Sequence, residues 1–146
     1  MLSDLLKTLL ASNFAYYLKA HFFHWNVEGR DFYEYHKFFQ DIYEDAYSAV
    51  DTIAESIRTL DSYAPGSLSR YAELSIIQDQ TKIPRAELMF VELLQDCETM
   101  SQLVVAMFDE ATNERQQGIA NYMAELQDLY AKKAWFIRSI LKKERE

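Results

Sequence analysis

Two histidines and two carboxylates have the residue types and spacing of a shared metal site. His24 lies near the end of one predicted helix, and His36, Asp51 and Glu55 lie on the next. Each ligand of a metal ion must lie about 2.0–2.6 Å from it. The fifteen positions from His36 to Asp51 span roughly 22 Å of straight helix. Either the four residues are unrelated, or a second copy of the chain completes the site.

The arrangement of these residues favours the second copy. Taken singly, Asp51 and Glu55 are typical of a solvated acidic face, and each histidine is typical of a hydrogen-bonded core residue. None of the three candidates on the second helix has Lys or Arg four positions later. If two copies pack this helix antiparallel, Asp51 and Glu55 of one copy come level with His36 and His24 of the other. A two-fold axis then generates two identical sites.

Composition favours a single all-helical domain over residues 1–146. Of the 146 residues, 49% are hydrophobic and 26% charged, while only three Gly and two Pro provide turns. We find no apolar run long enough to span a membrane and no signal-peptide pattern. Cys97 is the single cysteine, which fits a reducing compartment, so we expect a cytoplasmic protein.

Apolar residues at helical spacing predict four long helices and one short helix in the connection between the second and third. Asp31 is expected to cap the second helix, and Pro65-Gly66 to end it. This pattern is typical of a ferritin-like four-helix bundle. The expected ranges are 3–27, 31–62, 67–74, 84–111 and a last helix from about 113.

Fe(II) is the metal that these ligands suit, because imidazole and carboxylate ligands with open positions allow it to bind and then react. A metal site in the core of such a bundle would use Glu-x-x-His on two helices of one chain. That pattern does not occur in this sequence. Its absence places the predicted site at an interface between two copies.

At this point the chain resembles the Dps family of mini-ferritins, the DNA-binding proteins from starved cells. The resemblance rests on His24-Trp25-Asn26, Gly29, Phe32 and His36, followed by Asp51-Thr52-Ile53-Ala54-Glu55 on the same helix. It implies a hollow dodecamer that oxidises Fe(II), with hydrogen peroxide or oxygen, at sites between two-fold-related subunits. The ferric mineral is then stored inside. By this resemblance His24 and His36 come from one subunit and Asp51 and Glu55 from its partner.

Two further positions matter for a second iron ion. Many family members carry Asp where this chain has Gln40, so the second iron position loses an anionic ligand. His21 is one turn before His24 and is a candidate replacement, although a core or supporting role is the alternative. Trp25 is expected to lie beside the iron site, where it can intercept radicals, pack at the interface, or do both.

The resemblance also implies acidic pores that admit Fe(II). Asn121 falls where the last helix often has a pore Asp, which leaves Glu125 and Asp128 as pore candidates or as members of a solvated face. The net charge is −8, and we see no basic arm before the first helix, so we predict no DNA binding at physiological salt. The alternatives are a nucleoid DNA-coating protein and a cage that binds another metal, such as zinc, without redox chemistry.

Overall fold

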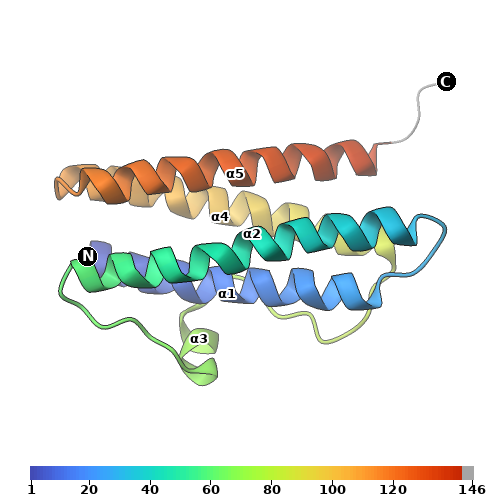
Figure 1. Ribbon diagram of the computed structural model, residues 1–146, viewed down its shortest axis with the longest axis horizontal. Helices are drawn as coiled ribbons and strands as arrows, with labels where there is room; N and C mark the ends of the chain where they lie inside the picture. The colour runs from blue at the N-terminus through green and yellow to red at the C-terminus, as the bar shows by residue number, and fades with distance from the viewer. Residues whose placement is uncertain (143–146) are drawn as a thin grey trace.

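Within residues 1–142, four long helices pack as two hairpins, and a short helix lies outside them (Figure 1). The computed structural model describes residues 1–142; residues 143–146, the end of the predicted domain, lie outside the described part. The first hairpin pairs α1 with α2, the second pairs α4 with α5, and α1 also packs against α4. This confirms the predicted all-α, ferritin-like four-helix bundle. The helices are α1 (Leu2–Asn26), α2 (Phe32–Thr59), α3 (Leu68–Leu74), α4 (Ala86–Asn113) and α5 (Gln117–Leu141).

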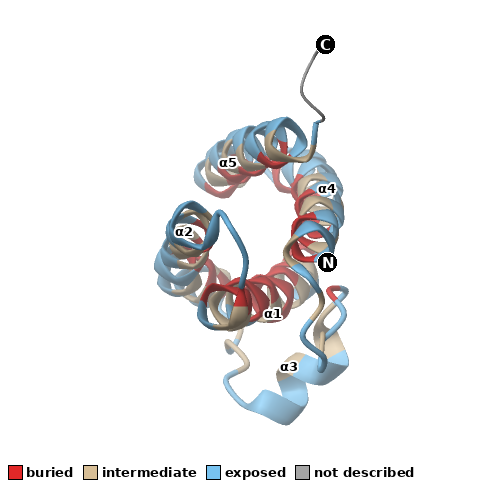
Figure 2. Cartoon of the chain, turned by 90° about the vertical axis from the view of Figure 1, so that its right-hand side faces the viewer, coloured by how far each residue is buried: buried red, intermediate tan, exposed pale blue. Residues whose placement is uncertain are grey.

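Buried residues lie on the inner faces of the four long helices, whereas α3 has none (Figure 2). The apolar stripe predicted for the second helix is largely buried, with Phe39, Ile42, Ile53 and Ile57 at most 1% exposed. Together with the buried Ala46 and Ala49 they recur every three or four residues, which keeps them on one face of α2. No helix within residues 1–142 is long and apolar enough to cross a membrane.

Helix α1 is apolar on two sides because it has two sets of neighbours. Leu6 and Phe23 face the bundle and are fully buried. Phe14 instead contacts Tyr71 of α3, with the ring centroids 5.1 Å apart. The apolar spacing of the first helix predicts one stripe that contains both Leu6 and Leu18, but Leu18 is 45% exposed. The second apolar side of α1 therefore packs against the connection between α2 and α4, residues 60–85, which we call the crossover.

The ends of α2 differ from the prediction in their details. Asp31 occupies the N-cap position, but its side chain makes no capping hydrogen bond. The helix ends at Thr59 rather than near Ser62. Asp61 has a φ of 59°, a left-handed conformation that stops the helix before Pro65-Gly66 is reached.

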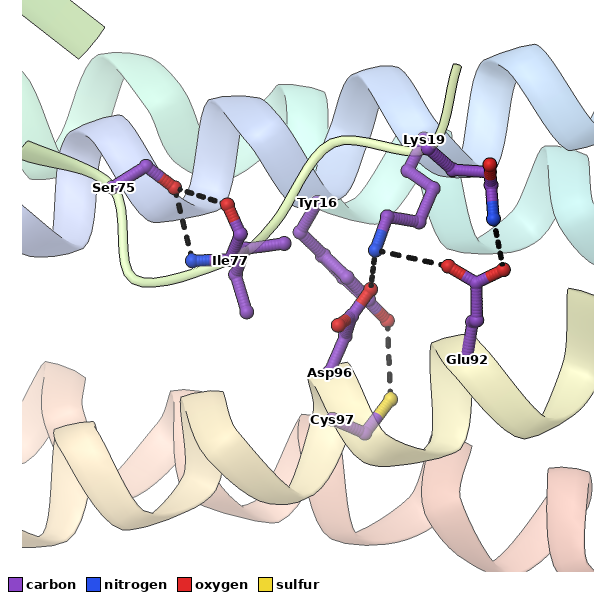
Figure 3. A network of polar contacts seen from close by, with 8 residues as sticks. Tyr16, Lys19, Ser75, Ile77, Glu92, Asp96 and Cys97 are labelled. Atoms are coloured by element: carbon purple, nitrogen blue, oxygen red, sulfur yellow. Dashed lines mark hydrogen bonds and ion pairs between the residues drawn. The ribbon is translucent and has the colours of Figure 1, made fainter. Parts of the chain in front are cut away.

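A buried ion-pair network joins the crossover, α1 and α4 (Figure 3). The Lys19 ammonium lies 2.9 Å from a carboxylate oxygen of Asp96 and 3.6 Å from one of Glu92. Gln80 of the crossover donates a hydrogen bond of 2.7 Å to Glu92. Burial raises the pKa of Asp96, and the attraction of Lys19 opposes that rise. Beside this network, burial raises the pKa of the Cys97 thiol to about 11, so the residue is an uncharged core side chain.

Replacing Lys19 with Met is expected to lower the free energy of unfolding by about 3–5 kcal/mol, because the buried Asp96 loses its counterion. The Lys19→Met, Asp96→Leu double variant should recover most of that loss. The measurement is urea unfolding at one fixed protein concentration. Lys132→Met is the control, since its ion pair with Asp128 is exposed and should contribute about 1 kcal/mol or less. Equal losses in the two single variants would contradict the role assigned to Lys19.

Candidate metal centre

The structure brings His24 and His36 together across the turn between α1 and α2. Nδ1 of His24 lies 2.8 Å from the carbonyl oxygen of His36, and Nδ1 of His36 lies 2.7 Å from the carbonyl oxygen of His24. The two rings stack with their centroids 3.7 Å apart and their planes 17° from parallel. Two residues twelve positions apart are thus joined by ring stacking and by two hydrogen bonds from ring to backbone.

These reciprocal hydrogen bonds determine which nitrogen of each ring is free. A carbonyl oxygen can only accept, so both Nδ1 atoms must donate. In the neutral imidazole, Nε2 then has no proton and keeps its lone pair for a metal ion. Backbone bonds of this kind orient metal-binding histidines. His24 is 8% exposed and His36 is half-buried, so the protein limits the motion of both rings.

The two carboxylate candidates lie toward the other end of α2. Asp51 and Glu55 are exposed, and neither forms an ion pair within residues 1–142. The described part of a single chain brings no three His, Cys, Asp or Glu side chains close enough to hold a metal ion. The chain therefore presents a histidine pair and a carboxylate pair as separate halves of a ligand set.

His21 is held among aromatic rings next to the histidine pair. Its ring stacks on Tyr43, with centroids 3.8 Å apart and planes 11° from parallel, and lies 4.2 Å from the ring of Trp25. The Tyr17 hydroxyl lies 2.9 Å from Nδ1 of His21. Burial lowers the pKa of His21, with a smaller effect from His24. Burial also raises the pKa of Tyr17, so the partners are a neutral phenol and a neutral imidazole at neutral pH.

Gln40 and the pore candidates already have partners on their own helices. The Gln40 amide donates a hydrogen bond of 2.8 Å to Glu44. On α5, Glu125 accepts from Asn121 at 3.4 Å, and Asp128 lies 3.2 Å from the Lys132 ammonium. The charge of Asp128 is therefore paired with that of a neighbouring lysine, whereas Glu125 accepts a hydrogen bond from a neutral amide.

Tyr17 is the residue that sequence reasoning missed. Tyr17 is one of the residues at apolar helical spacing in the first helix, a pattern that predicts a core role, yet its hydroxyl bonds to His21 beside the candidate ligands. Residues four apart on a helix share a face, so the spacing of Tyr17 and His21 was the available signal.

Comparison with known proteins agrees with this architecture over nearly the whole chain. The Ferritin family model, described as a ferritin-like domain, matches residues 3–146. The DNA protection during starvation protein of Helicobacter pylori strain J99 is 28% identical over 139 residues, which cover 94% of this chain and 96% of that protein. The crystal structure of Dps from Staphylococcus aureus is 29% identical, with a TM-score of 0.95, over 98% of this chain and 96% of that one.

The chain belongs to the Dps family of ferritin-like proteins. Another Dps protein, from Vibrio cholerae O1, is 26% identical with a TM-score of 0.93, and the match covers 97% of this chain and 89% of that one. That protein is described as a member of a broad superfamily of ferritin-like diiron-carboxylate proteins. At the level of the Dps family, membership supports iron binding and iron storage.

Proposed function

We propose that this protein is an iron-storing ferroxidase that oxidises Fe(II), mainly with hydrogen peroxide, and keeps the ferric product inside a hollow dodecamer. The observation that supports this best is the reciprocal bonding of His24 and His36. Both rings are fixed with Nε2 free, which is the state that a divalent metal ion requires. Iron is the substrate and the stored cargo in this proposal.

The proposed site takes His24 and His36 from one subunit and Asp51 and Glu55 from its partner. If antiparallel α2 helices bring His36 level with Asp51, the two-fold axis passes between Tyr43 and Glu44. A hollow at this point is lined by Tyr17, Tyr43, Glu44 and Tyr47. Tyr47 is 62% exposed, and an exposed aromatic at this point is suited to being covered by the second copy.

The ligand types account for the direction of the proposed reaction. Neutral imidazoles bind Fe(II) without adding charge, and the two carboxylates favour the extra positive charge of Fe(III). Gln40 and His21 are the candidates near a second iron position, where Gln40 contributes only a neutral amide. Glu125 and Asp128 are the proposed carboxylates along the iron entry path.

The proposal is tested by loading the protein with Fe(II) without oxygen, adding peroxide, and separating the products by size with iron detection. We expect soluble Fe(III) to elute with a shell much larger than one subunit, whereas iron treated identically without protein should precipitate. Iron that precipitates or elutes free in the presence of protein would contradict the proposal. Zinc bound at the site with no peroxide-dependent Fe(II) oxidation would favour the non-redox cage.

A further inference from the structure

Tyr17 and His21 form a hydrogen-bonded phenol–imidazole pair beside the candidate iron ligands. We propose that Tyr17 donates one electron to the peroxide reaction, and that His21 accepts its proton. This inference rests on the proposed ferroxidase function and adds two residues to it. Its basis is the 2.9 Å contact between the Tyr17 hydroxyl and Nδ1 of His21, together with the rings that join this pair to His24.

The need for an additional electron follows from the ligand set. Reduction of hydrogen peroxide takes two electrons, and one Fe(II) ion supplies one. His24, His36 and two carboxylates provide enough donors for one ion. A second ion would meet only neutral groups: the amide of Gln40, which is bonded to Glu44, and His21, whose Nδ1 is occupied by the Tyr17 hydroxyl. When a single Fe(II) reacts, the missing electron must come from another group, or a hydroxyl radical is released.

Aromatic rings connect the iron ligands to Tyr17 without a gap. The His24 ring lies 5.0 Å from the Tyr43 ring and 5.8 Å from the His21 ring, measured between centroids. Tyr43 stacks on His21 at 3.8 Å, and the Tyr17 ring is 5.5 Å from His21. An electron leaving Tyr17 therefore passes through at most one intervening ring before it reaches an iron ligand.

The proposed step balances in atoms and charge. Fe(II) and Tyr17 each give one electron to hydrogen peroxide, the O–O bond breaks, and two hydroxide ions form. In the neutral His21 tautomer with its proton on Nε2, the Tyr17 hydroxyl donates to Nδ1. The phenolic proton then moves to Nδ1, which leaves Fe(III), a neutral tyrosyl radical and an imidazolium. A base within hydrogen-bond distance lets the proton leave with the electron, and so avoids the unstable protonated radical. The faces of Tyr43 and Trp25 on either side of His21 stabilise the new positive charge.

Neither Trp25 nor Tyr43 has the same arrangement. Trp25 is 58% exposed, and its indole N–H has no base as a partner within residues 1–142. The Tyr43 hydroxyl also makes no hydrogen bond in the described part of the chain. Tyr17 is thus the aromatic residue near the site whose proton has an acceptor already in place.

The test uses assembled protein loaded with a single Fe(II) per site, mixed with hydrogen peroxide and frozen for electron paramagnetic resonance. We expect a tyrosyl radical in the wild type, with its signal changed by ring-deuterated tyrosine. Tyr17→Phe should abolish that signal and raise spin-trapped hydroxyl radical severalfold. His21→Phe keeps an aromatic ring but removes the base, so it should weaken the signal although Tyr17 is present.

Tyr63→Phe is the matched control, because Tyr63 is 82% exposed and lies beyond the end of α2. It should leave both the radical signal and the hydroxyl radical yield as in the wild type. An unchanged tyrosyl signal in Tyr17→Phe, or its loss in Tyr43→Phe alone, would overturn the assignment to Tyr17. Formation of Fe(III) is followed separately by absorbance, so either of these outcomes would contradict the role of Tyr17 without contradicting the proposed ferroxidase function. Absence of Fe(III) formation in the wild type would overturn both proposals.

Discussion

Replacing Asp51 with Asn is expected to slow peroxide-driven Fe(II) oxidation on the order of 100-fold, since loss even of a supporting group costs about 10–100-fold at metal sites. The substitution keeps the size of the side chain and removes the negative charge that favours Fe(III). Asp51 is exposed and forms no ion pair in residues 1–142, so the fold should not change. Stopped-flow absorbance of Fe(III) measures the initial rate, and size-exclusion chromatography checks the assembly.

Asp109→Asn provides the matched control for this change. Asp109 is an exposed acid on α4, so the substitution alters net charge equally at a different helix. Its oxidation rate should equal that of the wild type. An Asp51 variant as fast as the wild type would show that Asp51 is not a ligand. Both variants slowed by the same factor would indicate a general effect of charge on Fe(II) attraction.

Two inactive variants are expected to regain activity when they assemble together. One carries His24→Ala and His36→Ala, and the other carries Asp51→Asn and Glu55→Gln. In a mixed two-fold pair, one site receives both intact halves and the other receives neither. If pairing is random, half of the pairs are mixed, so about a quarter of the wild-type sites should be restored. Co-expression with two different tags isolates the mixed shells, and the rate is measured per subunit.

The control for this experiment co-assembles His24→Ala with His36→Ala. Both changes lie on the same half of the proposed site, so no mixed pair contains an intact site and no activity should return. Recovery in both mixtures would point to a site that is not divided as proposed. Failure of recovery in the complementary mixture would rule out a site shared between two-fold-related subunits.

The helical packing was predictable from sequence because apolar spacing determines which face of each helix is buried. Phe39, Ile42, Ala46, Ala49 and Ile53 illustrate this, since these buried residues follow one another at intervals of three or four. The helix ends were less predictable. Asp61 and Arg115 both adopt a φ of 59°. A glycine at these positions would have indicated such a conformation, whereas Asp and Arg do not. Helices α2 and α4 therefore end at backbone turns that propensity rules do not identify.

The candidate ligands were visible in the sequence as residue types at fixed spacing, and their roles as ligands remain a prediction. Spacing could not show that His24 and His36 bond to each other's carbonyl oxygens, because that depends on how the turn between α1 and α2 orients two rings. The same limit applies to Tyr17 and His21. Their spacing places them on one face, but only side-chain conformations produce the hydrogen bond between them.

Helix α2 has a further consequence for how such a protein can change over time. All of its buried residues are apolar, whereas Asp51 and Glu55 lie on its exposed side: the buried residues are Phe39, Ile42, Ala46, Ala49, Ile53 and Ile57. A mutation on the buried side alters core packing within one subunit without replacing a proposed ligand. A mutation on the outer side alters metal preference without opening a cavity. Natural variation, or a protein engineer, can therefore replace the proposed metal ligands of this helix without changing its packing.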